Sequence, residues 1–295
     1  MSDPLEGKVC LVTGTTGGIG LEIARGLARR GAHVILHGRT IERAEAVGAS
    51  IRQRNKNVQL ETVGADLGSL AEVREMAKEV ARRHPKLDVL VNNAGVLMTR
   101  LELSKDGYEM TFAVNHLAPF LLTNMLLESL RNSGAGRVVT LASVAHRGGF
   151  IDFGNLKGER GFNSMAIYSS SKLANVLFTN ELANRVEGTG VTANCLHPGV
   201  INTGLWRRSR PIAMAFGLCQ LFFPDASKGA DTALYLAGDP AVAGLNGGYF
   251  SKRKMRSPAP QAFDADVQRR LWDVSAEITG VGKDATPAHS PEVEV

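Results

Sequence analysis

The sequence predicts an α/β fold in which a doubly wound parallel sheet of about seven strands carries helices on both faces. Two observations predict this fold. Short β-branched runs alternate along the chain with longer helical patterns, which is typical of βαβ units. Several of these runs are also hydrophobic at nearly every position, as strands covered on both faces must be.

The expected strands follow one another at intervals that leave room for a helix between them. In chain order they are KVCLVTG (8–14), HVILHG (33–38), VQLETVGA (58–65), LDVLVNNAG (87–95), GRVVTLAS (136–143), VTANCLHPG (191–199) and GGYFS (247–251). Helical patterns begin near Ile19, Ile41, Ser69, Tyr108, Met165 and Ser227. No repeat or linker interrupts them, so we expect one domain over residues 1–282 and a disordered tail over residues 283–295.

Composition limits the function classes. A chain of 295 residues with 44% hydrophobic residues can bury a large core in one domain. The net charge of +5 is mild and the basic residues are scattered among acidic ones, so no nucleic-acid partner is expected.

Cysteine usage and hydropathy indicate the compartment. Cys10, Cys195 and Cys219 show no paired spacing, which favours a reduced, cytoplasmic protein and gives no indication of a metal site. The longest apolar run, residues 212–223, is too short to span a bilayer, so we expect no transmembrane segment.

The first predicted strand leads into a glycine-rich turn, TGTTGGIG (13–20), which opens a helix. Glycines let the backbone approach a pyrophosphate, whose charge is met by free N–H groups and the positive end of the helix. The sequence therefore predicts dinucleotide binding at Gly14, Gly18, Ile19 and Gly20. The alternative is a tight strand-to-helix turn that binds no ligand.

The end of the second predicted strand indicates which dinucleotide is bound. A free ribose 2′-hydroxyl favours an acidic residue there, but the chain offers His37, Gly38 and Arg39. An arginine can grip a 2′-phosphate through charge-assisted hydrogen bonds, so NADP(H) is expected over NAD(H). Replacing Gly38 by Asp and Arg39 by Ala should then reverse this preference. The alternative is a surface arginine without a ligand.

A tyrosine and a lysine lie four residues apart in IYSSSKLAN (167–175), inside an apolar, helix-forming run. Residues at i and i+4 share one face of a helix, so Tyr168 and Lys172 can act on the same ligand. The same spacing also occurs where a half-buried tyrosine lies beside a solvated lysine. The motifs in the rest of the sequence therefore decide between a functional pair and this ordinary arrangement.

These motifs together resemble the short-chain dehydrogenase/reductase family, in its single-domain branch, and within it the retinol-dehydrogenase-like members. The resemblance runs from about residue 7 to about residue 282. It is carried by TGxxxGxG (13–20), NNAG (92–95), Asn115, Ser143 in LASVAH, Tyr168 with Lys172, PG-x-x-x-T (198–203), SKLANVLFTNEL (171–182) and RRLWDVS (269–275). It implies a Rossmann-type fold. One departure is Ala142, where many relatives carry a serine.

The resemblance implies a carbonyl–alcohol chemistry with four catalytic residues. Tyr168 would supply the proton, and the Lys172 ammonium would lower the pKa of its phenol from about 10 and hold the nicotinamide ribose. Ser143 would hydrogen-bond the substrate oxygen. Asn115 would hold a water that links Lys172 to solvent, unless its side chain is satisfied by ordinary partners.

The resemblance also implies further cofactor contacts. Asp66, with Leu67 beside it, would receive the adenine amino group, although a loop acid near a helix start is an ordinary alternative. Asn93 and Ala94 would line the adenine ribose and Thr203 would face the nicotinamide carboxamide, and the remaining implied cofactor contacts are Gly95, Pro198 and Gly199.

The segment over residues 203–224 combines bulky apolar residues with Arg207, Arg208 and Arg210. We expect a lid over a small apolar alcohol or carbonyl substrate, such as a retinoid, a steroid or an aliphatic aldehyde. Two alternatives stay open, a helix that covers the core and a peripheral contact with a membrane.

Two runs, PFLLTNMLL (119–127) and NVLFTNEL (175–182), could pack across a two-fold axis. The resemblance implies such helix pairs in a homodimer or homotetramer, whereas the alternative is that both helices only cover the sheet. The expected protein is an NADP(H)-dependent oxidoreductase. A non-catalytic NADP(H)-binding protein and an NAD-dependent alcohol dehydrogenase remain the alternatives.

Overall fold

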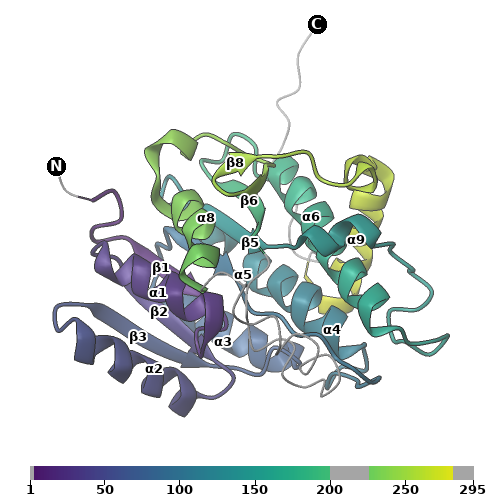
Figure 1. The fold of residues 1–295 in the computed structure, drawn as a ribbon, viewed down its shortest axis with the longest axis horizontal. Helices are drawn as coiled ribbons and strands as arrows, with labels where there is room; N and C mark the ends of the chain where they lie inside the picture. The colour runs from purple at the N-terminus through teal and green to yellow at the C-terminus, as the bar shows by residue number, and fades with distance from the viewer. Residues whose placement is uncertain (1–2, 200–225, 282–295) are drawn as a thin grey trace, which may run out of the picture.

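The protein is described by a computed structural model over residues 3–199 and 226–281. One sheet with the strand order β3-β2-β1-β4-β5-β6-β7-β8 runs through these residues (Figure 1). Strands β1 to β7 are parallel and β8 is antiparallel to β7. Their bounds are β1 Val9–Val12, β2 His33–Gly38, β3 Gln59–Gly64, β4 Val89–Asn92, β5 Arg137–Leu141, β6 Thr192–His197, β7 Tyr249–Ser251 and β8 Lys254–Met255. The predicted Rossmann-type sheet is confirmed, and β8 is too short to give a sequence pattern.

Helices cover both faces of the sheet, as Figure 1 shows. One face carries α1 (Gly18–Arg29), α2 (Ile41–Arg54) and α8 (Ala226–Gly238). The other face carries α3 (Leu70–Arg83), α5 (Ala118–Asn132) and α6 (Ser164–Arg185). Shorter turns connect these elements: α4 (Met110–Phe112), the π-helical η1 (Ala113–Leu117), and the 3₁₀ turns η2 (Val144–Gly148), η5 (Pro240–Val242) and η6 (Pro260–Phe263).

The two faces explain why the strand sequences are apolar at successive positions. In β1, Leu11 packs into the core cluster beneath α3 and α5, while Cys10 and Val12 pack into the cluster beneath α1 and α8. All three side chains are fully buried. Alternate residues of a strand point to opposite faces, so a sheet covered on both sides needs apolar residues at each position.

The last helix, α9 (Ala265–Thr279), is not among the helices predicted from the sequence. Its start is capped by Asp264, whose carboxylate accepts hydrogen bonds from two backbone N–H groups, and its end is capped by Gly280 in the left-handed conformation. Trp272 of α9 packs against Phe120 of α5 and Phe178 of α6, with ring centroids 4.9 and 5.9 Å apart. Within one chain, α9 therefore covers apolar residues that were expected at a two-fold interface, and homo-oligomerisation stays a prediction.

One helical stretch, Met110–Asn132, is long and apolar enough to cross a membrane by length and composition. Most of its apolar window, 78%, is buried inside the fold. A core helix passes the same test, so this stretch is weak evidence for a membrane span.

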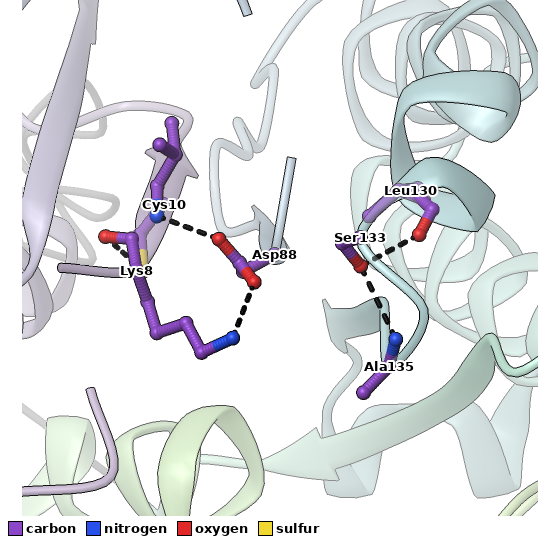
Figure 2. A network of polar contacts seen from close by, with 7 residues as sticks. Lys8, Cys10, Asp88, Leu130, Ser133 and Ala135 are labelled. Carbon is purple, nitrogen blue, oxygen red and sulfur yellow. Dashed lines mark hydrogen bonds and ion pairs between the residues drawn. The ribbon is translucent and has the colours of Figure 1, made fainter. Parts of the chain in front are cut away.

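Polar contacts fix the edge of the sheet where the parallel strands begin (Figure 2). The carboxylate of Asp88 accepts hydrogen bonds from the Lys8 ammonium and the Val9 N–H, each 2.9 Å long. Nearby, the Ser133 hydroxyl donates to the Leu130 carbonyl at 2.7 Å and so closes the turn after α5. These contacts are at the amino ends of the strands, which leaves the carboxyl ends for a site.

Several sequence predictions lie outside the described residues. These are Thr203, the segment 203–224 with its three arginines, Cys219 and the tail 283–295. The other two cysteines, Cys10 and Cys195, are free thiols buried in the core.

Candidate active site

A cleft of about 780 Å³ opens at the carboxyl ends of β1, β2, β4, β5 and β6. In a doubly wound sheet this edge, where the strand order reverses between β1 and β4, is where ligands bind. The cleft brings together most of the predicted site residues that the structure describes. They are Gly14, Gly18, Ile19, Gly20, Arg39, Asp66, Leu67, Asn93, Ala94, Gly95, Ser143, Tyr168, Lys172, Pro198 and Gly199. Asn115 is the exception.

The glycine turn after β1 has a geometry that favours glycine. Gly14 and Gly18 have φ angles of 69° and 57°, a region that glycine adopts far more easily than other residues. A Cβ atom on Gly20 would lie 2.3 Å from the Gly14 carbonyl oxygen. No side chain caps the start of α1, and the residues of its first turn line the cleft, where the positive end of a helix can receive an anion.

Asn93 supports this turn from the neighbouring strand. Its side-chain amide donates to the carbonyl oxygens of Thr13 and Gly14 at 2.7 and 3.2 Å. The Thr13 hydroxyl in turn accepts the N–H groups of Asn93 and Ala94. The amide donors of Asn93 are therefore engaged within the protein, and its predicted contact with the ribose would have to use its other atoms.

His37 is a site residue to which sequence analysis assigned no role. Its Nδ1 accepts the Gly14 N–H at 3.0 Å, and its Nε2 lies 3.0 Å from the Ala65 carbonyl oxygen. Burial lowers the pKa of His37 to about 4, so the ring is neutral at physiological pH and Nε2 carries the proton. The ring thus ties the ends of β1, β2 and β3 together. The sequence feature that could have indicated this role is a histidine at the end of an otherwise apolar strand.

Two cations face the part of the cleft next to β2. Arg39 was predicted there, whereas Arg43, in the first turn of α2, was not. Both are exposed, and across residues 3–199 and 226–281 neither forms an ion pair with a carboxylate. Unpaired arginines beside a cleft can receive an anionic group such as a phosphate.

Asp66 fits both of its sequence interpretations. One carboxylate oxygen accepts the Gly68 N–H at 2.9 Å and forms a local turn. The Asp66 N–H donates to Glu72 at 2.8 Å, which fixes the start of α3. The residue still lines the cleft, so a ligand can approach the carboxylate while the turn is kept.

Three predicted catalytic side chains converge at the other part of the cleft. Tyr168 and Lys172 lie one turn apart on α6, and the side chain of Ser143, which follows β5, is close enough to the Tyr168 hydroxyl to favour its ionised form. The Lys172 ammonium donates to the Leu141 carbonyl oxygen at 3.0 Å and lies 5.7 Å from the centre of the Tyr168 ring. Both α6 residues are buried, with exposed fractions of 8% and 5%.

Burial controls the protonation of this pair. It lowers the pKa of Lys172 to about 8, which leaves most of the amine charged at pH 7. It raises the pKa of the Tyr168 phenol, and the side chain of Ser143 opposes that shift only in part. The net shift of the Tyr168 pKa is therefore upward, whereas the sequence predicts a downward shift from the Lys172 ammonium, because loss of solvent is the largest effect at the phenol.

Asn115 lies behind the cleft and is fully buried in the π-helical turn η1. Its amide donates to the Val96 carbonyl and the Ser171 hydroxyl at 2.9 and 3.0 Å, while its oxygen accepts the Val96 N–H at 2.7 Å. The side chain is thus satisfied by ordinary protein partners. π-helical turns are frequent at functional sites, and this one joins the loop after β4 to α6.

Ser143 is positioned by His146, to which the sequence patterns assigned no role. The ring Nδ1 of His146 lies 2.5 Å from the Ser143 carbonyl oxygen, and Nε2 accepts the Ala259 N–H at 2.9 Å. Burial lowers the pKa of this ring, so it is neutral with the proton on Nδ1. His146 therefore connects the Ser143 loop to the segment that leads into α9.

We expect His146→Asn and His146→Gln to separate the two bonds of this histidine. An asparagine amide can replace Nδ1 as donor to Ser143, whereas a glutamine amide reaches the position of Nε2. Both variants should lose stability, by about 1–3 kcal/mol for the unpaired buried group. Only His146→Gln should also lower kcat, about ten-fold. Urea unfolding and steady-state kinetics measure the two effects, and equal kcat values in both variants would contradict the positioning role.

The fold and site define a class of protein, and comparison with known sequences identifies the same class. The sequence profile of the short chain dehydrogenase family matches residues 8–212, and the chain belongs to this family. Within it, the chain is a retinol-dehydrogenase-like member. It is 42% identical to retinol dehydrogenase 14 of Mus musculus over 293 residues, which covers 95% of this chain and 88% of that protein. It is 41% identical to retinol dehydrogenase 13 of Homo sapiens over 284 residues, covering 94% and 86%.

Solved structures of the family share the fold. An uncharacterized protein from Mycobacterium paratuberculosis matches with a TM-score of 0.77 and 33% identity over 94% of each chain. A gluconate 5-dehydrogenase from Burkholderia cenocepacia, solved with NADP and tartrate, matches with a TM-score of 0.67 and 26% identity over 83% of this chain and 93% of that chain. The chain is therefore an oxidoreductase of the alcohol–carbonyl type that uses a nicotinamide cofactor.

Proposed function

We propose that the protein is an NADP(H)-dependent oxidoreductase that interconverts an apolar alcohol and its aldehyde or ketone, with Tyr168 as the acid and base. The observation that carries the proposal is that Ser143, Tyr168 and Lys172 line the same cleft as Arg39 and Arg43, which form no ion pair within the described residues. The Tyr168 hydroxyl can move a proton, and the two arginines can hold a phosphate.

The cleft has the right length for a dinucleotide. Arg39 and Arg43 follow β2, and Ser143 follows β5. In the order β2-β1-β4-β5, these two strands are separated by three strand spacings. Neighbouring strands are about 4.8 Å apart, so these ends of the cleft are about 14 Å apart. The glycine turn lies between them, at β1, where a pyrophosphate would join the two nucleotide halves.

In the proposed reduction, a nicotinamide held in this cleft beside Lys172 would supply the hydride that the carbonyl carbon receives. The Tyr168 hydroxyl donates its proton to the carbonyl oxygen, while the Ser143 hydroxyl hydrogen-bonds the same oxygen as charge develops on it. The Lys172 ammonium stabilises the resulting phenolate until it is reprotonated. Oxidation runs these steps in reverse, with the Tyr168 phenolate as the base.

The raised pKa of Tyr168 favours reduction at neutral pH. Burial keeps the phenol protonated, and the protonated form is the one that a carbonyl reduction needs. The rate of reduction should therefore be flat near pH 7, whereas the rate of oxidation should rise with pH as the phenolate forms.

An apolar substrate is supported by the side chains beside the catalytic group. Leu97 and Met98 line the cleft, as do Val144 and Met165, whose exposed fractions are 47% and 44%. Exposed apolar side chains in a cleft are typical of a binding surface for an apolar ligand. The names of the related retinol dehydrogenases make retinoids the first candidate, with steroids and aliphatic carbonyls as alternatives.

A substrate panel tests this proposal. NADPH oxidation should be followed at neutral pH with retinaldehyde, aliphatic aldehydes of increasing chain length, a steroid ketone and a small polar sugar ketone. We expect kcat/KM to rise with apolar surface and the sugar to be a poor substrate. Turnover restricted to the sugar would contradict the apolar class. NADPH binding without turnover would favour a non-catalytic binding protein, and faster turnover with NADH an NAD-dependent dehydrogenase.

Assembly and location remain proposals that rest mainly on the sequence. The reduced thiols of Cys10 and Cys195 are compatible with the proposed cytoplasmic location. A homodimer or homotetramer is proposed by family resemblance, and light scattering at micromolar concentration tests it. The proposed lid or membrane contact of residues 203–224 rests on its composition alone.

A further inference from the structure

A group of three potential metal ligands lies outside the cleft. Nε2 of His33 is 3.0 Å from one carboxylate oxygen of Glu61, and Nε2 of His84 is 3.1 Å from the other. The ligand atoms of the three residues all lie within 4.8 Å of one another. The two imidazole rings meet edge to face, with centroids 5.3 Å apart.

Three separate elements hold these side chains. His33 is the first residue of β2, Glu61 belongs to β3, and His84 caps the end of α3. In the parallel register His33 pairs with Gln59, so Glu61 is two residues further along β3 and projects from the same face as Gln59. Exposed side-chain fractions of 23%, 29% and 11% leave the group partly buried with one open side.

We propose that His33, Glu61 and His84 bind a divalent metal ion of the zinc type. Two imidazoles and one carboxylate are a donor set that suits Zn²⁺, with bonds of about 2.0–2.2 Å and a fourth position for water. Tetrahedral bonds of that length need donor atoms about 3.3 Å apart, and each histidine nitrogen is already close to this spacing from one of the two Glu61 oxygens. Because the two nitrogens face different oxygens, the Glu61 carboxylate must rotate to bind through one oxygen, and the three donor atoms must draw together from within 4.8 Å. Each ring then carries its proton on Nδ1.

Arg83 is the competing cation at this group. One of its guanidinium nitrogens is 3.1 Å from Glu61, and the other is 3.4 Å from Glu79. A metal ion and the guanidinium cannot share the Glu61 carboxylate without repulsion, so metal binding requires Arg83 to turn toward Glu79. Removing the Arg83 charge should therefore tighten metal binding, an effect opposite to that of removing a ligand.

The bound metal would act as a clip between β2, β3 and the end of α3. His33 begins its strand and His84 ends its helix, so the group lies toward the amino edge of the sheet, away from the catalytic cleft at the carboxyl edge. Metal binding should raise thermal stability because it favours the folded state, and it should leave turnover unchanged.

Calorimetric titration of the full chain with Zn²⁺ tests the proposal, with Co²⁺ absorption as a report on tetrahedral geometry. We expect one saturable site and a higher Tm with Zn²⁺. His33→Gln and His84→Gln should each weaken binding at least ten-fold, on the scale of losing one strong ligand contact. Arg83→Gln should tighten it about ten-fold, since hydrogen bonds to charged groups are worth about that factor.

Arg82→Gln is the matched control, because Arg82 is the exposed neighbour and the charge change is the same. Its affinity for Zn²⁺ should equal that of the wild type. The proposal is overturned if the wild type shows no saturable binding, or if the double variant His33→Gln/His84→Gln binds Zn²⁺ as tightly as the wild type. It is also overturned if Arg83→Gln and Arg82→Gln behave alike.

Discussion

Replacing Tyr168 by Phe should lower kcat by roughly 10²–10⁴-fold, the range of a general acid–base contribution. The variant keeps the ring that fills the site and removes only the hydroxyl, which shares the cleft with Ser143. NADPH affinity, measured by fluorescence titration, should change little, because no phosphate or glycine contact is altered. The loss should therefore be in turnover rather than in binding.

Tyr235→Phe is a suitable control for this change. Tyr235 is a half-buried tyrosine of α8, outside the cleft, whose ring carries the Arg253 guanidinium 5.7 Å from its centre. It loses the same hydroxyl group and should keep full activity. Turnover by Tyr168→Phe within a few-fold of the wild type would rule out the phenol as the acid.

The second large effect concerns cofactor choice. The wild type should favour NADPH over NADH by about ten- to a hundred-fold in kcat/KM, because charge-assisted hydrogen bonds to a phosphate contribute about 1.5–3 kcal/mol. Arg39→Ala/Arg43→Ala should remove most of this preference by weakening NADPH and leaving NADH nearly unchanged. Steady-state kinetics with both cofactors measures the ratio.

Gly38→Asp is not a suitable variant for testing this cofactor preference. A Cβ atom on Gly38 would lie 3.0 Å from both the Ala44 nitrogen and the Thr40 carbonyl oxygen, so any side chain there must move the turn between β2 and α2. Arg54→Ala is a suitable control for the Arg39→Ala/Arg43→Ala variant, because it removes an exposed arginine at the far end of α2. If Arg54→Ala changed the ratio as much as the cleft variant does, general charge rather than phosphate contact would be responsible.

Sequence patterns predicted those parts of the protein that depend on local rules. Strand hydrophobicity reflects burial on both faces of the sheet, and glycine spacing reflects backbone constraints such as the positive φ angles at Gly14 and Gly18. The i, i+4 spacing of Tyr168 and Lys172 likewise depends only on helix geometry, and both lie on α6.

Contacts between distant segments were not predictable from these patterns. His37 and His146 each join carbonyl and N–H groups from separate parts of the chain, and a single histidine letter does not reveal its partners. The protonation of Tyr168 also depends on how deeply tertiary packing buries the phenol. The helix α9 had local signals, Asp264 at its start and Gly280 at its end, that were overlooked.

Hydride transfer to a carbonyl carbon is the central claim, and isotopic labelling tests it directly. The protein should be incubated with NADPH that carries deuterium at both C4 positions and with retinaldehyde, and the product examined by mass spectrometry. The account predicts retinol with one deuterium on its carbinol carbon, formed by the wild type and nearly absent with Tyr168→Phe. Retinol without deuterium, or bound NADPH that reduces none of the carbonyls of the panel, would contradict it.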